Sequence, residues 1–275
     1  MAKPRPPHRR PTPRPNRPPS ESHAQGRPRE SGSGGGNAKA EPQWVWGLHP
    51  VRAALANTRR TIKRLLAAPQ AQGSIAALAK ARGVEPEIVE QGRIANLVPP
   101  DSVHQGVAAL LAPMPAMDIQ DALEGTAAPR RVVVLDQVTD PHNIGAILRS
   151  SAAFGVCAVI VQDRHTPQIS GIVAKAASGA AEIVPLVRVT NIARALEELE
   201  EAGFQRIGLA DEATGQIGAV DRTRDLAIVL GAEGEGMRRL TRENCDVLVA
   251  LPTRAEMPSL NVSNACAVTL YAVLP

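Results

Sequence analysis

Apolar residues in the second half of the chain fall into short runs separated by segments with helical spacing. The runs are rich in Val, Ile and Leu and lack the alternation of a strand that has one face in water. Such strands are typical of a mostly parallel sheet buried on both faces. We therefore predict strands at Val132–Leu135, Ala158–Val161, Ile183–Leu186, Gln205–Leu209, Leu226–Leu230 and Val247–Leu251.

Between these runs, apolar residues recur at the three- and four-residue spacing of amphipathic helices. Helices are predicted at about 143–154, 168–178, 190–202 and 237–243, and a last one begins at Val262. Strict alternation of strand and helix after residue 130 predicts an α/β fold, a mostly parallel sheet with helices on both faces.

The first half predicts a smaller α/β module. Its expected elements are a helix at His49–Ala56, a strand at Thr61–Ala67, a helix at Ile75–Arg82 and a strand at Val107–Leu111. Prolines punctuate the next stretch, where Asp118–Glu124 has the pattern of a brief helix. The predicted organisation is a tail over 1–41, a small α/β domain over 42–113, a linker over 114–129 and a larger domain over 130–275.

Charge is concentrated in the tail. The first forty residues hold nine Lys or Arg and nine prolines against two Glu, whereas the other 235 residues hold 22 basic and 25 acidic side chains. A segment of this composition does not fold alone and favours loose binding to a polyanion such as nucleic acid, although a merely solvated tail is the alternative. It has no apolar stretch, so we expect no signal peptide or membrane span there and a cytoplasmic protein.

The sequence does not indicate a metal site or a redox-active pair of cysteines. The three cysteines lie far apart without the paired spacing of a zinc or redox site, and the six histidines form no ligand cluster. We expect small core thiols in a reducing compartment and no metal.

Three unusual loops follow predicted strands, where an open parallel sheet binds its ligands. The first, residues 135–150, predicts Asn143 as a helix N-cap after Pro141, with Arg149 one turn beyond Gly145. The missing side chain of Gly145 would clear space for Arg149 to lean back toward the helix start. A solvent-exposed arginine is the alternative.

The second loop runs from Leu230 to Met237 and contains three glycines. Glycine lets the backbone approach a ligand closely, so main-chain groups here could hold an adenosine-like molecule. The order G-x-x-G-x-G differs from the dinucleotide fingerprint, and the Walker lysine is absent, which argues against a nicotinamide, flavin or nucleotide-triphosphate enzyme. A flexible turn is the alternative.

The third loop brings Ser259 and Asn261 to the start of the last helix, where Ala265, Cys266 and Ala267 permit close packing. Ordinary helix capping would explain these two polar residues as well. Three such loops after three buried strands favour a binding site.

The segments DPHNIGAILRSSAAFGV (140–156), LGAEGEGMRRLTRENCD (230–246) and SLNVSNA (259–265) resemble, in order and spacing, the SpoU/TrmH family of SPOUT methyltransferases. The likeness runs from about Trp46 onward and is strongest to the branch that methylates a guanosine ribose in 23S rRNA. WGLHPVRAAL resembles the start of the family's small substrate-binding domain.

The resemblance implies a trefoil knot in the C-terminal segment, a homodimer, and S-adenosylmethionine as cofactor. It places the cofactor against Leu230, Gly231, Gly236, Leu251 and Leu260. The active-site positions it implies are Asn143, Arg149, Glu233, Ser259 and Asn261. Glu256-Met257-Pro258 departs from the smaller polar residues expected there, which affects loop shape and substrate choice. Pairing with Arg238 or Arg239 is the alternative role of Glu233.

In this chemistry Arg149 would stabilise a developing alkoxide or hold a phosphate, because a guanidinium stays protonated and is a poor base. Five aromatic residues are too few for a base-stacking platform, so RNA would be recognised mainly by shape and backbone, and Trp44 and Trp46 are better core or boundary anchors. A tRNA methyltransferase, a resistance enzyme acting on rRNA, and a non-catalytic RNA-binding or assembly factor are the alternatives.

Overall fold

The computed structural model describes residues 41–164, 166, 169–254, 256–257 and 259–274. The Arg- and Pro-rich tail up to residue 40 and Pro258 of the third loop lie outside the described residues.

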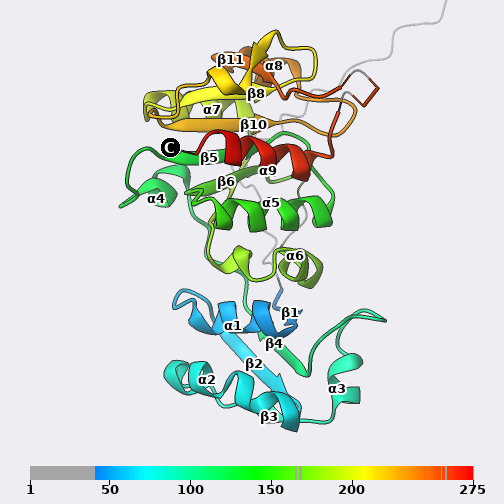
Figure 1. Cartoon of the computed structure of the whole chain (residues 1–275). Coiled ribbons are helices and arrows are strands. Elements are labelled where there is room, and N and C mark those ends of the chain that lie inside the picture. The colour runs from blue at the N-terminus through cyan, green and yellow to red at the C-terminus, as the bar shows by residue number, and fades with distance from the viewer. Residues whose placement is uncertain (1–40, 165, 167–168, 255, 258, 275) are drawn as a thin grey trace, which may run out of the picture. The chain divides into compact units, whose positions relative to one another are not determined.

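The larger part of the fold is a seven-stranded sheet in which every pairing is parallel (Figure 1). The strands lie in the order β7-β6-β5-β10-β8-β11-β9, so β10 sits between β5 and β8. They are β5 (Arg131–Leu135), β6 (Ala158–Gln162), β7 (Leu186–Val189), β8 (Gln205–Leu209), β9 (Gly215–Gln216), β10 (Leu226–Leu230) and β11 (Val247–Ala250).

Helices cover both faces of this sheet, because successive strand residues point to opposite sides and both sides are apolar. Val133 and Leu135 belong to a core that also contains residues of α5 (Pro141–Ala153), α6 (Gly171–Ala176) and α9 (Val262–Ala272). Val132 and Val134 belong to a second core with α4 (Ile119–Leu123) and α7 (Ile192–Glu201). The predicted α/β fold, with a parallel sheet covered by helices on both faces, is confirmed.

The start of α5 corrects one prediction. Asp140, and not Asn143, is the N-cap, because its carboxylate accepts the amide of His142 at 3.0 Å and Pro141 occupies the first helical position. Asn143 lies inside the first turn, and its side chain is left to act elsewhere.

The strand predicted at Ile183–Leu186 is also wrong. A 3₁₀ turn, η2 (Ala180–Glu182), precedes these residues, and β7 begins only at Leu186. Val184 is buried in the core while Ile183 is 66% exposed, so the apolar run belongs to a connection that packs one side chain inward.

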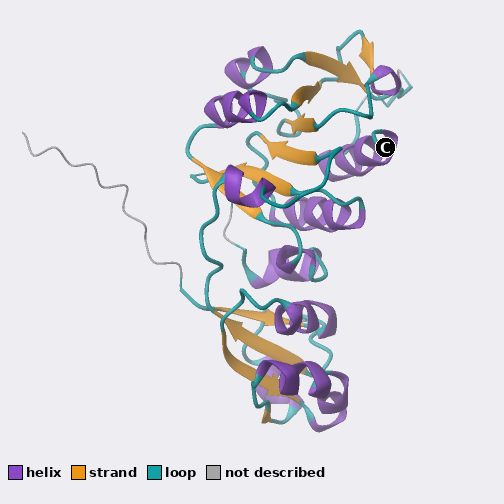
Figure 2. Cartoon of the chain, turned by 90° about the vertical axis from the view of Figure 1, so that its left-hand side faces the viewer, coloured by secondary structure: helices purple, strands orange, loops and turns teal. Residues whose placement is uncertain are grey.

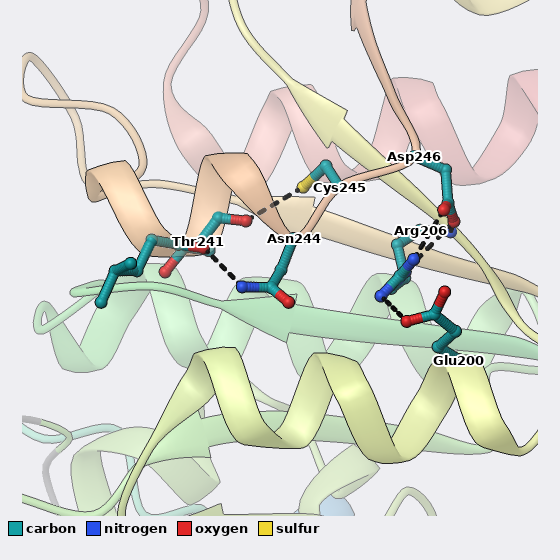
Figure 3. Close-up of polar contacts among 7 residues, drawn as sticks. Glu200, Arg206, Thr241, Asn244, Cys245 and Asp246 are labelled. Atoms are coloured by element: carbon teal, nitrogen blue, oxygen red, sulfur yellow. Dashed lines mark hydrogen bonds and ion pairs between the residues drawn. The ribbon is translucent and has the colours of Figure 1, made fainter.

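Arg206 joins three elements of this domain (Figure 3). Its backbone N–H and guanidinium donate to Asp246 at 2.7 and 2.6 Å, and a second guanidinium nitrogen donates to Glu200 of α7 at 2.7 Å. Asp246 lies just before β11, so this arginine holds the strand beside β8. The short helix α8 (Arg239–Glu243) leads into this region.

The smaller module is a four-stranded sheet in the order β1-β4-β2-β3 with helices on both faces (Figure 2). Its strands are β1 (Gln43–Trp46), β2 (Ile62–Ala67), β3 (Glu87–Ile88) and β4 (Val107–Leu111). Its helices are α1 (Leu48–Ala56), α2 (Ala76–Arg82), α3 (Gln91–Ala95) and the 3₁₀ helix η1 (Pro69–Ser74). The four elements predicted here are present within a residue of their expected ends, whereas β1, β3, α3 and η1 were not predicted.

Buried contacts tie residues of this module to η2 and α6. Arg60 and Glu182 form an ion pair at 3.0 Å with both side chains 4% exposed, and Asn57 donates to the same carboxylate at 2.9 Å. Trp46 is buried against Gly171, where an added Cβ would lie 1.9 Å from its ring. The tryptophan is an anchor in the core, as predicted.

Candidate functional site

Loops at the carboxyl ends of β8, β10 and β11 surround a cavity of about 500 Å³. Parallel strands bring their carboxyl ends to one edge of a sheet, which explains how loops far apart in sequence line one space. The five residues predicted to hold a cofactor all line it, and Glu233 and Ser259 line it too. They are Leu230, Gly231, Gly236, Leu251 and Leu260.

The glycine loop is closed on itself, so it is not a flexible turn. Ala232 and Gly236 exchange two backbone hydrogen bonds of 3.1 and 2.9 Å. A Cβ at Gly231 would lie 2.0 Å from the carbonyl carbon of Gly236 and 2.2 Å from the nitrogen of Met237. Only glycine fits at position 231 in this closed form.

A polar cluster joins all three loops. The side-chain amide of Asn261 donates to the Asn143 oxygen at 3.1 Å and to Glu233 at 3.4 Å. Its oxygen accepts the backbone N–H and the hydroxyl of Ser263 at 2.9 and 2.6 Å. Asn261 therefore caps α9, as the alternative in the sequence analysis allowed, and presents its donor to the other two residues.

Glu233 does not take the alternative partners suggested by the sequence. Arg238 pairs with Asp136 at 2.6 Å, and Arg239 pairs with Glu243 at 2.7 Å. Glu233 thus faces the cavity with Asn261 as its hydrogen-bonding neighbour among the described residues.

Arg149 is not brought to this cluster. Its side chain is exposed on α5, and it has no hydrogen bond or ion pair with the described part of the chain. The space at Gly145 does not serve it either, because a Cβ there would lie 2.4 Å from Ala176 and 2.9 Å from the nitrogen of Ala177. Gly145 makes room for α6, which corrects the prediction that it makes room for the arginine.

Further charged residues belong to this region and were not predicted as part of the site, among them Glu235 of the glycine loop. Asp136 follows β5, and the loop after β8 brings Asp211 and Glu212 to the cavity wall, where Glu212 forms an ion pair with Arg242. The hydrogen bond from Arg242 holds the pKa of Glu212 below its usual value. Asp211 and Glu212 follow β8, so the rule that sites follow parallel strands would have found them had it been applied to that strand. Asp136 lies in the first loop, but its burial and its partner are not visible in the sequence.

The described residues do not support a cysteine nucleophile or a metal site. Burial raises the pKa of Cys245 and of Cys266 to about 12, so both thiols stay protonated near neutral pH and neither is a nucleophile. The described residues contain no group of three or more His, Cys, Asp or Glu that could hold a metal ion. Within the described part of the chain, no helix is long and apolar enough to cross a membrane.

Two families match the chain in succession. The SpoU rRNA Methylase family matches residues 130–271, and the family of RNA 2'-O ribose methyltransferase substrate binding matches residues 44–116.

Curated relatives agree with these matches. A protein of Pseudomonas putida named 23S rRNA (guanosine-2'-O-)-methyltransferase RlmB is 41% identical over 235 residues, which cover 82% of this chain and 94% of that protein. A protein of the same name from Vibrio cholerae is 50% identical over 171 residues, 61% of this chain and 69% of its own.

Among solved structures, the SpoU methyltransferase AviRb from Streptomyces viridochromogenes, in complex with AdoMet, has a TM-score of 0.72 and 24% identity, covering 85% of this chain and 89% of its own. That likeness shows a shared fold. The family match covers every strand of the seven-stranded sheet, and the Pseudomonas putida relative aligns over 94% of its length. The chain belongs to the SpoU rRNA methylase family.

Proposed function

We propose that this protein methylates a ribose 2′-hydroxyl in RNA, using S-adenosylmethionine, and that its substrate is a guanosine of 23S rRNA. The observation that carries the proposal is the cavity lined by the glycine loop, next to the Asn143–Asn261–Glu233 cluster. The substrate is inferred from the relatives, whose printed names specify a guanosine of 23S rRNA.

The cavity suits the proposed cofactor in size and chemistry. Its volume of about 500 Å³ is in the range of small-molecule sites, and the glycine loop offers main-chain groups without side chains in the way. Leu251 and Leu260 supply apolar wall. Carboxylates of Asp211, Glu233 and Glu235 line the cavity, which favours a ligand that carries a sulfonium charge.

When bound, the cofactor supplies an electrophilic methyl group, so the chain's own residues need only bind, orient and stabilise. Asn143 and Asn261 hold each other in fixed orientations, and Glu233 is an acceptor for a ribose hydroxyl or a base N–H. Ser259 adds a hydroxyl to the same wall. Arg149, free of partners among the described residues, is proposed to stabilise negative charge on the ribose oxygen or to hold a phosphate.

The balance of basic and acidic side chains differs between the two domains and supports different roles for them. We assign residues 42–113 to RNA binding and 130–275 to methyl transfer, joined by 114–129. Eight basic and four acidic side chains lie in 42–113, whereas 130–275 holds 14 basic and 17 acidic side chains. Attraction to phosphate therefore falls on the small domain and the basic tail.

Two further parts of the proposal concern assembly and location. We propose a homodimer, supported by α9, which leaves Tyr271 71% and Val268 46% exposed. A cytoplasmic location follows from the proposed substrate, because ribosomal RNA is made and assembled there.

The decisive experiment transfers labelled methyl from S-adenosylmethionine to total RNA of cells that lack this gene, with mass identification of the product nucleoside. We expect 2′-O-methylguanosine in the 23S fraction. Arg149→Ala should lose about 100-fold in rate with unchanged cofactor affinity, since stabilising charge in the transition state is worth about that much. Arg194→Ala is the control, because Arg194 is also a highly exposed helix arginine of this domain, with a side chain 78% exposed on α7.

If the labelled methyl group appeared in tRNA and not in 23S rRNA, the protein would be a tRNA ribose methyltransferase. Absence of cofactor binding and of label in every RNA fraction would refute the enzyme and leave an RNA-binding or assembly factor.

A further inference from the structure

Asp136 is fully buried at the carboxyl end of β5, one residue beyond the last strand position. A buried carboxylate is costly unless it is paired and hydrogen-bonded, so its partners decide its role. The next residue, Gln137, has a φ of 61°, in the left-handed region that non-glycine residues rarely adopt. The backbone therefore turns sharply just after the carboxylate and leads toward α5 and Asn143.

All polar contacts of Asp136 go to the two ends of the glycine loop. Its backbone N–H donates to the carbonyl of Leu230 at 2.8 Å, where the loop begins. Its carboxylate accepts the backbone N–H of Arg238 at 2.9 Å and the Nε of the same arginine at 2.8 Å, and a terminal guanidinium nitrogen lies 2.6 Å away. One residue directly after β5 thus contacts both Leu230, before residues 231–237, and Arg238, after them.

The loop depends on this second anchor. The Ala232–Gly236 hydrogen bonds close its interior, but they leave Met237 and the path to α8 undetermined. The contact with Asp136 fixes the backbone at Arg238, immediately beyond Met237, which itself lines the cavity. The carboxylate is acceptor-only when ionised, so its geometry selects one position of the Arg238 backbone N–H.

We propose that Asp136 is a positioning residue for the cofactor cavity: through Arg238 it holds the glycine loop at a set distance from the start of α5. Asp136 does not line the cavity, so it acts through the loop. This assignment rests on the proposed function, because it takes S-adenosylmethionine as the cavity's ligand.

The structure contains a matched control on the same two strands. Asp225, just before β10, accepts the backbone N–H of Arg130 at 2.5 Å and its Nε at 2.8 Å, just before β5. The two Asp–Arg pairs share one bonding pattern and both bridge β5 and β10. One pair lies at the carboxyl ends by the cavity, and the other lies at the amino ends, away from the cavity lining.

The test is titration calorimetry of S-adenosylmethionine with the full chain, beside thermal unfolding. We expect Asp136→Asn to weaken cofactor binding about tenfold or more, the loss of a charge-assisted contact, whereas Asp225→Asn stays within about twofold. In methyl transfer, the defect should appear in the KM for cofactor, with kcat largely recovered at saturation. Should Asp136→Asn fail to fold, Arg238→Gln serves instead, because the Arg238 side chain is 39% exposed.

Arg238→Lys should recover part of the affinity lost in Arg238→Gln, since the ammonium keeps the charge and the backbone N–H is unchanged. Wild-type affinity in Asp136→Asn, or equal losses in Asp136→Asn and Asp225→Asn, would overturn the assignment alone. A wild-type chain that binds no S-adenosylmethionine would overturn the proposed function and this assignment with it.

Discussion

Replacing Gly231 with alanine tests whether the closed form of the glycine loop holds the cofactor. The new methyl group would lie 2.0 Å from the carbonyl carbon of Gly236, 2.4 Å from its oxygen and 2.2 Å from the nitrogen of Met237. These are backbone atoms, so no side chain can rotate away, and the loop must open.

Opening breaks the two hydrogen bonds between Ala232 and Gly236, at 3.1 and 2.9 Å. Each contributes about 1 kcal/mol, so the closed loop becomes less favourable by about 2 kcal/mol. If only the closed loop binds, the apparent Kd for S-adenosylmethionine rises about thirtyfold.

Calorimetric titration of the variant measures this directly. Gly218→Ala is the control, because no described atom lies within 4 Å of a Cβ at that position. Gly234→Ala should fall between the two, since Gly234 has a φ of 84° but a Cβ added there meets nothing within 4 Å among the described atoms. An unchanged Kd in Gly231→Ala, with the variant folded, would refute the role given to the closed loop.

Three other perturbations follow from buried or paired charges. Arg131→Met should lower the free energy of unfolding by about 3 kcal/mol or more, because Arg131 is 3% exposed and its guanidinium donates to four backbone carbonyls. One of these carbonyls is that of Val273, directly after α9, so unaltered hydrogen exchange in α9 would contradict the prediction. Glu182→Gln should cost about 3–5 kcal/mol in urea unfolding by leaving Arg60 buried without its counter-charge, and wild-type stability would speak against the pair. The hydrogen bond from Arg206 holds the pKa of Asp246 below its ordinary 3.8, so this stabilisation is complete above that pH and is lost as pH falls through the lower folded value. Asp246→Asn should therefore be less stable than wild type at neutral pH and approach it in acid, and a gap that does not shrink at all as the pH falls below 3.8 would be inconsistent with this.

The strands were predictable where burial is uniform. Leu226–Leu230 and Val107–Leu111 have the ends that the sequence predicted, because each is apolar throughout. Gln205–Leu209 also has its predicted ends, although it begins with Gln205 and Arg206. The run at Ile183 failed because periodicity cannot tell a buried strand from a connection that buries one residue. β1 was missed, being four residues long.

The site was partly predictable for a similar reason. Glycines and polar residues directly after a strand are visible locally, and those of the three loops do line the cavity or its polar cluster. Asp136 and Arg238 were not seen as partners because 102 residues separate them and only the strand order places β10 beside β5. Arg149 was placed wrongly relative to Gly145, because the sequence does not say which helix fills a glycine's empty side.

Arg131 also constrains the order in which the parts of the protein can fold during synthesis. The ribosome delivers β5 early, yet the carbonyl of Val273 that receives its guanidinium lies 142 residues later, and β10, the neighbour of β5, also emerges after β6, β7 and β8. During synthesis, β5 therefore has one edge unpaired until β10 emerges. The guanidinium of Arg131 also lacks the Val273 carbonyl that accepts its hydrogen bonds in the folded protein. In the small module, by contrast, no strand has to wait for a later pairing partner in the sheet, since all four strands precede residue 112. A nascent chain would thus complete the strand pairing of the small sheet while the seven-stranded sheet still lacks β10.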